Sequence, residues 1–231
     1  MENTDVVYIL RNGIAENVDE LAYSLRTVCK NWTYRRVWFV GGDPRTIKPD
    51  GAIYHTQRGA SRYEKVRDSV ARVCECGDIS DPFYLFNDDF FIMRPFTEYQ
   101  PRRHGTIWEH VERLQNRWHG SNYTKEIEYT AQLLKQYGYT QYNYALHVPF
   151  LVNKKKALEV YRAFPSSSMF KDLYGNYCNI GGVEAEDGKV TAILEQPKGD
   201  IISTTEATFA HGFVGQVIRQ RFNKKSKYEG V

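Results

Sequence analysis

The chain has 231 residues, of which 42% are apolar and 26% are charged. This composition suits one compact domain and excludes disordered and collagen-like proteins. Lys and Arg number 31 against 28 Asp and Glu, a net charge of +3, which argues against a protein that coats nucleic acid. We therefore expect a single domain over residues 1–231, with its first half over 1–100 and its second over 101–231.

Neither a membrane segment nor a zinc site is indicated by the sequence. No apolar run approaches the roughly 20 residues that cross a bilayer, and the first residues lack the pattern of a secretory signal. The cysteines lack paired CxxC spacing and are interpreted as packing or surface thiols; they are Cys29, Cys74, Cys76 and Cys178. These features favour a cytoplasmic protein without a membrane span.

Predicted strands and helices alternate in the first half of the chain. Apolar runs predict strands over residues 5–10, 36–40, 52–56 and 83–86. A helix capped by Asn17 or Asp19 follows the first strand, and a capping box from Ser61 to Glu64 opens a second helix. This alternation is typical of an α/β fold, in which helices flank a mainly parallel sheet.

The second half is less regular. We expect a helix over 122–136, a strand over 145–152 that Pro149 places at an edge or bulge, and a helix after Asn153. A further strand is expected over 189–195. The chain then carries a basic tail with Arg219, Arg221, Lys224, Lys225 and Lys227. This tail is either a solvated terminus or a surface that steers an anionic partner, such as nucleic acid or an acidic glycan.

Polar segments follow three of the predicted strands and should converge at one edge of the sheet. Their candidate binding residues are Arg11, Asn12, Asp43, Asn87, Asp88 and Asp89. Two adjacent carboxylates between apolar residues are costly unless a cation neutralises them. Because such oxygen ligands suit Mg²⁺ or Mn²⁺, Asp88 and Asp89 are predicted to hold an ion against nucleotide phosphates. The alternatives are a turn cap or an ion pair with Arg94.

Three other side chains are candidates for a site. His147 and His211 lie within apolar stretches, where a histidine is either a hydrogen-bonded core residue or a ligand. Gly212 would let a ligand approach the second of these closely. Arg67 lies on the helix that begins near Ser61, whose N-terminus could face a phosphate. A solvated helix face is the alternative for this arginine.

Four segments between residues 5 and 155 resemble a known family in order and spacing. They are Asp5-Val-Val-Tyr, Asp19-Glu-Leu-Ala-Tyr-Ser-Leu-Arg26, Leu85-Phe-Asn-Asp-Asp-Phe-Phe-Ile92 and His147-Val-Pro-Phe. The chain resembles the Stealth proteins, which include bacterial capsular-polysaccharide phosphotransferases and the lysosomal-enzyme N-acetylglucosamine phosphotransferase. The core of that family is similar to the GT-A glycosyltransferase fold, whose acidic motif holds a divalent ion against a nucleotide diphosphate.

The resemblance implies a GT-A-like, Rossmann-type fold whose half over 1–100 binds a nucleotide-diphosphate sugar. Asp5 would begin the nucleotide-binding strand, while Asp88 and Asp89 would match the acidic motif. His147 matches a later histidine of the family and is, with Asp89, a candidate catalytic residue. By similarity to GT-A enzymes, His211 is a candidate third metal ligand. The remaining candidates for nucleotide binding are Arg11, Asn12, Asp43, Arg67 and Asn87.

The activity that this resemblance favours is metal-dependent glycosyl transfer, with the half over 101–231 closing over the acceptor. The donor would be a nucleotide-diphosphate sugar, and the acceptor a glycan, a protein or a nucleic acid. The Stealth proteins themselves transfer a hexose 1-phosphate. Because Ile9-Leu10-Arg11 departs from the Thr-Trp-Val of that family, this reaction is kept as the alternative to glycosyl transfer. A non-catalytic module that binds carbohydrate or nucleotide is a second alternative. A metal-dependent phosphoesterase is disfavoured, since no second ligand cluster has suitable spacing.

Overall fold

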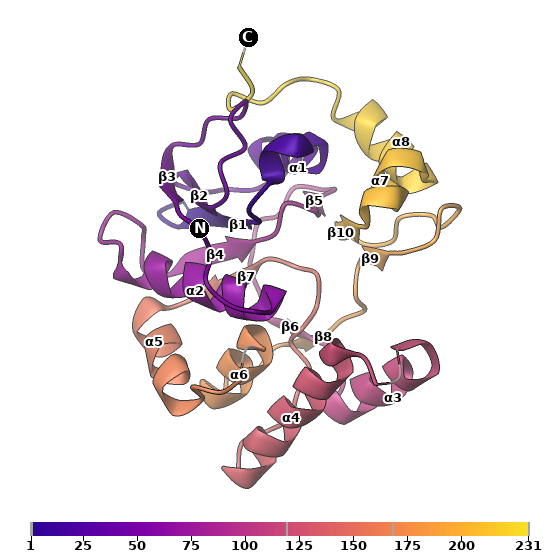
Figure 1. Cartoon of the computed structure of the whole chain (residues 1–231). Coiled ribbons are helices and arrows are strands. Elements are labelled where there is room, and N and C mark those ends of the chain that lie inside the picture. The colour runs from indigo at the N-terminus through magenta and orange to yellow at the C-terminus, as the bar shows by residue number, and fades with distance from the viewer. Residues whose placement is uncertain (1, 119, 168, 231) are drawn as a thin grey trace.

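A five-stranded sheet lies at the centre of the computed structural model, which describes residues 2–118, 120–167 and 169–230 (Figure 1). Its order is β3-β2-β1-β4-β7. The strands are β1 (Asp5–Leu10), β2 (Val37–Gly41), β3 (Gly51–Tyr54), β4 (Phe83–Phe86) and β7 (Phe150–Val152). The first four are parallel, and β7 pairs antiparallel with β4. The predicted α/β class with a mainly parallel sheet is confirmed.

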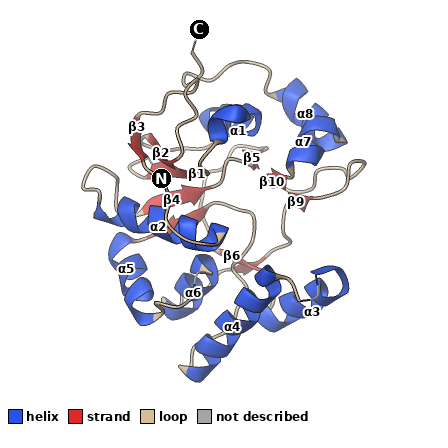
Figure 2. Cartoon of the chain, viewed as in Figure 1, coloured by secondary structure: helices blue, strands red, loops and turns tan. Residues whose placement is uncertain are grey.

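Helices cover both faces of this sheet, as Figure 2 shows. Val6 and Tyr8 of β1 pack in one core with α1 (Asp19–Asn31). Val7 and Ile9 point to the other face, where a second core forms. Its helices are α2 (Arg62–Glu75), α5 (Lys154–Ala163) and α6 (Phe170–Tyr177). Burial on both faces explains why β1 has a continuous apolar sequence.

Two further helices and a small sheet extend from the second core (Figure 1). The helices α3 (Ile107–Trp118) and α4 (Asn122–Gln136) contact each other. The second has the bounds expected from the sequence, and the Ser121 side chain accepts a hydrogen bond from the backbone N–H of Thr124 at its start. Strand β6 (Arg102–Arg103) pairs in parallel with β8 (Val183–Glu184). This pairing connects the segment before α3 with the segment after α6.

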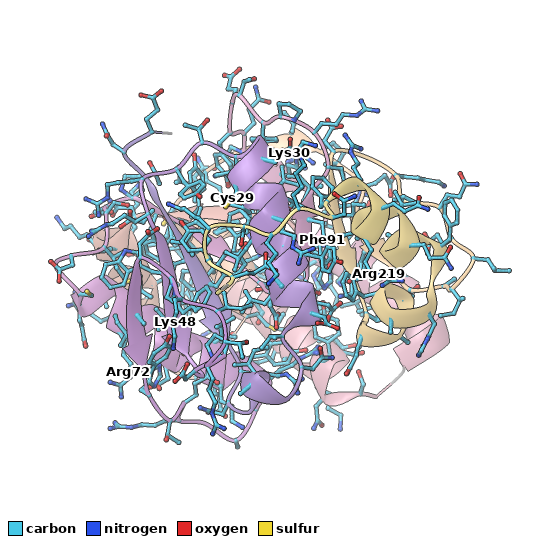
Figure 3. The ribbon with its side chains drawn as sticks, turned by 90° about the horizontal axis from the view of Figure 1, so that it is seen from above. Cys29, Lys30, Lys48, Arg72, Phe91 and Arg219 are labelled. Atoms are coloured by element: carbon cyan, nitrogen blue, oxygen red, sulfur yellow. The ribbon has the colours of Figure 1, made fainter. Side chains whose placement is uncertain are left out.

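A three-stranded sheet beside α1 forms a separate layer. Strand β10 (Ile201–Thr204) pairs antiparallel with β5 (Phe90–Ile92) and parallel with β9 (Lys189–Val190). The helices α7 (Glu206–His211) and α8 (Phe213–Arg221) complete its core. Phe91 stacks on Phe209 with ring centroids 5.6 Å apart, and Figure 3 shows Phe91 and Arg219 on the side where these helices lie.

Three sequence-based boundaries are corrected by the structure. The expected strand over 145–152 begins only after Pro149, which has no N–H to donate to a ladder. The strand expected over 189–195 ends at Val190, because the next two backbone N–H groups donate to the Glu195 carboxylate. The N-cap of α1 is Val18 rather than Asn17 or Asp19. No helix within the described ranges is long and apolar enough to cross a membrane.

The C-terminal segment packs against the central domain. The Tyr228 side chain is 3% exposed, and its hydroxyl donates to Asp50 Oδ2 at 2.7 Å. Glu229 accepts two hydrogen bonds from the Arg26 guanidinium, at 2.9 and 2.6 Å. These contacts contradict the interpretation of the whole tail as a solvated terminus, although Lys224 is exposed.

Truncation after Phe222 is therefore expected to destabilise the protein. The deletion removes buried Tyr228 and leaves Arg26 without its carboxylate, so the free energy of unfolding should fall by about 3 kcal/mol or more. Urea denaturation measures this difference. The double variant Lys224→Ala, Lys225→Ala is the matched control and should unfold like the wild type, because it keeps the buried contacts. An unchanged midpoint for the truncated protein would show that the segment does not stabilise the fold.

Candidate functional site

A cleft of about 370 Å³ opens beyond the carboxyl ends of the parallel strands. Arg11 follows β1, and Asn87, Asp88 and Asp89 follow β4. The other ionisable side chains that line the cleft are Glu20, Arg62, Lys65, Lys189 and Glu206. In open α/β sheets, ligands bind at this edge. The structure thus brings together the polar segments after β1 and β4.

Asp89 lies at the inner wall of the cleft and is held through one oxygen. Lys189 Nζ donates to Asp89 Oδ2 at 2.6 Å, and the hydroxyl of Ser203 donates to the same oxygen at 2.8 Å. Asp89 Oδ1 is buried and has no hydrogen-bond partner among the described residues. A buried carboxylate oxygen without a donor is costly unless a cation or water reaches it. The alternative pairing with Arg94 does not form, since Arg94 contacts Asp200 at 3.5 Å.

Three carboxyl groups crowd this part of the cleft. Burial, and then the charge of Asp89, raise the pKa of Asp88 to about 6. Burial also raises the pKa of Glu20 to about 7, and the charges of Asp89 and Asp88 add to this effect. The hydroxyl of Thr204, which donates to Glu20 Oε1 at 2.6 Å, acts in the opposite direction. A bound cation would relieve the cost of ionising these groups.

The available oxygen atoms fit a hard divalent ion such as Mg²⁺ or Mn²⁺. The carboxylate of Asp88 and the unpartnered Oδ1 of Asp89 offer ligands, and such ions complete their shell with water and phosphate oxygens. Within the described ranges, no group of three His, Cys, Asp or Glu side chains is placed to hold a metal. His211 is exposed at the end of α7 and does not line the cleft, so the structure does not bring it to the carboxylates.

Replacing Asp88 by Asn is expected to stabilise the metal-free protein near neutral pH. Because the folded pKa is about 6 against an ordinary 3.8, the folded state binds more protons between these values. Stability therefore falls as the pH rises through that window, by up to about 3 kcal/mol. Asp88→Asn escapes this loss. Melting temperatures at about pH 4 and about pH 7 test it: the variant should gain on the wild type only at the higher pH. An equal gain in melting temperature at both pH values would contradict the raised pKa of Asp88.

A second cavity, which we call the side chamber, adjoins the cleft and has a volume of about 330 Å³. Arg62, Val66 and Asn87 line both cavities. Tyr63 and Tyr123 stack in its wall with ring centroids 5.8 Å apart, and the Arg62 guanidinium lies 4.7 Å from the centroid of Tyr63. Aromatic faces beside polar groups suit the apolar face and the hydroxyls of a sugar ring.

A histidine–aspartate pair lies at the side chamber. His147 Nδ1 is 2.8 Å from Asp187 Oδ2, and the backbone N–H of His147 donates to the other carboxylate oxygen at 3.0 Å. Burial raises the pKa of Asp187, but the hydrogen bond and charge of His147 outweigh it and hold this pKa below its usual value. A carboxylate at Nδ1 orients the ring and leaves Nε2 as the free nitrogen, which is the arrangement of a general base.

A half-buried lysine fixes the segment that carries His147. Lys171 Nζ donates to the backbone carbonyls of Leu146 and Val148, at 2.8 and 3.0 Å. Burial lowers the pKa of this ammonium to about 8, although the charges of Asp187 and Asp89 favour its protonated form. The lysine therefore positions the residues on either side of His147.

Two of the candidates from the sequence lie far from the cleft. Asp5 is buried at the start of β1, at the opposite end of the strand from Arg11, and pairs with Arg35 at 2.6 Å. Arg67 is engaged by the loop around α5 and donates to four backbone carbonyls, those of Tyr161, Phe164, Pro165 and Ser167. Both side chains have structural partners, and neither lines the cleft or the side chamber.

Two further candidates do not line the cleft. Asp43 is exposed, and its Oδ1 accepts a hydrogen bond from the backbone N–H of Arg45 at 2.8 Å. Asn12 accepts a hydrogen bond from the backbone N–H of Gln57 at 3.2 Å and donates to the carbonyl of His55 at 3.3 Å. Asn12 therefore supports the segment after β3 rather than facing the cleft directly.

The sequence matches no protein-family model, and it matches no curated protein. Among solved structures, the chain is similar to an active-site mutant of LgtC, with a TM-score of 0.46 at 14% identity over 98% of this chain and 85% of that one. The galactosyltransferase LgtC with donor and acceptor sugar analogues gives a TM-score of 0.46 at 13% identity, with the same coverage. The glycosyltransferase GlyE of Streptococcus pneumoniae TIGR4 gives a TM-score of 0.37 at 8% identity, over 96% and 53%.

The names of these neighbours identify glycosyltransferases. At such low sequence identities and TM-scores, the likeness carries no argument about the function of this chain. The resemblance to the Stealth family stays a prediction.

Proposed function

We propose that the protein is a glycosyltransferase that uses a nucleotide-diphosphate sugar. The observation that carries this proposal is the junction of two unlike cavities at Asn87. One holds carboxylates and cations at the ends of parallel strands, and the other holds aromatic rings and a histidine–aspartate pair. A donor with a charged diphosphate and a neutral sugar has the same two-part character.

The donor diphosphate is assigned to the cleft. Arg11, Arg62 and Lys65 line it and supply positive charge to phosphate oxygens. Asp88 and Asp89 would hold Mg²⁺ or Mn²⁺, which when bound neutralises the charge of the leaving diphosphate. In this proposal residues 1–100 supply most of the nucleotide-binding cleft, and Lys189 and Glu206 complete its wall. The cations and carboxylates together place the phosphates near the side chamber.

The transferred sugar and the acceptor are assigned to the side chamber, whose wall combines residues of the first half with residues of the half over 101–231. The Nε2 atom of His147 takes the proton of an acceptor hydroxyl while the oxygen of that hydroxyl bonds to the anomeric carbon of the donor sugar. The bond from that carbon to the diphosphate oxygen breaks, and its electron pair leaves with the diphosphate. Asp187 holds the imidazole in orientation through Nδ1. The rings of Tyr63 and Tyr123, which stack on each other in the chamber wall, would contact the sugar.

The acceptor is proposed to be a glycan, a protein or a nucleic acid. Three basic residues of the C-terminal segment, Arg221, Lys224 and Lys225, border a groove at the far end of α1, which Lys30 also lines. Lys30 is ten residues from Glu20 in the cleft, or about 15 Å along the helix. If this groove steers an anionic acceptor, it contacts a part of the acceptor that lies away from the reacting groups. A cytoplasmic location likewise stays a prediction.

Product analysis tests the proposed activity against its alternatives. The purified protein is incubated with UDP- and GDP-sugars and Mn²⁺, and the released nucleotide is identified by chromatography. Glycosyl transfer or donor hydrolysis releases a nucleoside diphosphate, whereas transfer of a hexose 1-phosphate releases a nucleoside monophosphate. Binding without release of either nucleotide would indicate a non-catalytic module. We expect the diphosphate, and we expect its release to disappear in Asp88→Asn.

A further inference from the structure

A glutamine stands in the cleft wall on the side away from the carboxylates. Gln57 lies in the loop after β3, and its side chain lines the cleft although the residue is only 8% exposed. Its Nε2 donates to the hydroxyl of Ser69 at 3.0 Å. No hydrogen bond reaches its Oε1 from the described part of the chain. A nearly buried amide therefore keeps one unused polar atom at the wall of a cavity.

A chain of polar contacts behind Gln57 sets which amide atom is unused. His55 Nδ1 lies 3.4 Å from Asp68 Oδ2 without forming a hydrogen bond, and the charge of this carboxylate favours the proton on that nitrogen. His55 Nε2 then accepts from the Ser69 hydroxyl, 3.2 Å away. Because Ser69 donates to the histidine, its oxygen accepts from Gln57 Nε2. With this tautomer of His55, the amide of Gln57 presents Oε1 toward the cleft as a hydrogen-bond acceptor.

These three residues do not form a hydrolytic triad. Ser69 is fully buried and lines neither the cleft nor the side chamber, so its hydroxyl cannot reach a substrate. The contacts of Asp68, His55 and Ser69 end on Gln57, which does face the cleft. Their arrangement is that of a support for the glutamine rather than of a nucleophile and its base.

The strand order places Gln57 and Asp88 so that one nucleotide could contact both. A Cβ atom on Gly41, at the end of β2, would lie 2.8 Å from Gln57 Nε2, so the amide covers the end of that strand. Asp88 follows β4, and β1 separates the two strands. Two strand spacings are about 10 Å. This distance is comparable to that between the pairing edge of a nucleobase and the phosphates of the same nucleotide.

We propose that Gln57, oriented by Ser69, His55 and Asp68, selects the nucleobase of the donor by accepting a hydrogen bond from a ring N–H group. This inference rests on the proposed function, because it assumes a nucleotide in the cleft. Uracil and guanine carry such a ring N–H at their pairing edge. Cytosine and adenine carry a ring nitrogen lone pair at the equivalent position. That lone pair would face Oε1 and leave a buried acceptor unpaired.

Matched nucleotides test this selection by calorimetry in the presence of Mn²⁺. UDP and CDP differ little in size, as do GDP and ADP, so each pair isolates the hydrogen-bonding pattern of the base. In the pair whose base size fits the cleft, we expect the nucleotide with a ring N–H to bind at least tenfold more tightly than its counterpart. That nucleotide is UDP in the first pair and GDP in the second. Gln57→Leu should reduce that ratio to near one. Gln57→Glu keeps an acceptor and should keep the ratio, even if all affinities fall.

The outcomes separate this inference from the proposed function. Equal affinities within each pair for the wild type, or an unchanged ratio in Gln57→Leu, would overturn the role of Gln57 while leaving a nucleotide-binding cleft intact. Failure of all four nucleotides to bind would overturn the proposed function and this inference with it. Ser69→Ala tests the support: a folded variant with a reduced ratio agrees with the proposal, and an unchanged ratio shows that the glutamine needs no orientation by Ser69.

Discussion

Asp88→Asn and Asp89→Asn are each expected to weaken Mn²⁺-dependent binding of a nucleoside diphosphate by about 100-fold or more. Both changes remove an oxygen charge that would face the ion, and Asp89→Asn also leaves the ammonium of Lys189 beside a neutral amide. The fold should persist in both, because neither side chain belongs to an apolar core. Calorimetry with and without Mn²⁺ measures the effect.

The matched control for this experiment is Asp200→Asn. Asp200 is an exposed carboxylate that pairs with Arg94 outside the cleft. Its replacement therefore makes the same chemical change outside the proposed binding site. Its nucleotide affinity should equal that of the wild type. Unchanged affinity in both Asp88→Asn and Asp89→Asn would remove these carboxylates from the proposed site.

His147→Gln is expected to lower kcat by about 100- to 10,000-fold, the usual contribution of a general base, with little change in donor affinity. Glutamine retains polarity but cannot take up the acceptor proton. Asp187→Asn should lower kcat to a smaller extent, because the imidazole remains but loses the carboxylate charge that stabilises its protonated form. Steady-state kinetics together with donor titrations separate these effects from a loss of binding.

Chemical rescue distinguishes a base from a residue that only packs at the site. Added imidazole should restore part of the activity of His147→Gly, since the small base can occupy the vacated position. His104→Gln serves as the control, because His104 contacts Glu184 away from both cavities and should retain full activity. If His147→Gln loses thermal stability but keeps its kcat, the histidine is structural.

The sequence predicted the elements whose patterns are local. Apolar runs located β1, β2 and β4, and the capping box at Ser61 located the start of α2. The structure adds that Phe90–Ile92 leaves the central sheet and pairs with β10, more than a hundred residues later. Nothing in a short apolar run specifies which distant strand it joins. The short helices α7 and α8 were missed because Gly212 interrupts their pattern.

The site was predictable only where its residues are adjacent in sequence. Asp88 and Asp89 could be recognised because their apolar flanks make two carboxylates conspicuous. Lys189 reaches Asp89 from 100 positions away, and Asp187 reaches His147 from 40 positions away. Such partners have no local signal and depend on the pairing of the second sheet. His211 was placed by analogy with other enzymes, and the structure puts it outside the cleft.

A crystal structure of the protein soaked with UDP or GDP and Mn²⁺ tests the central claim most directly. The account predicts the diphosphate beside Asp88 and Asp89, with the nucleobase extending toward Gln57 and the side chamber left for the sugar. Electron density for the nucleotide only in the basic groove near Lys30, or no bound nucleotide at concentrations that saturate binding in solution, would contradict it.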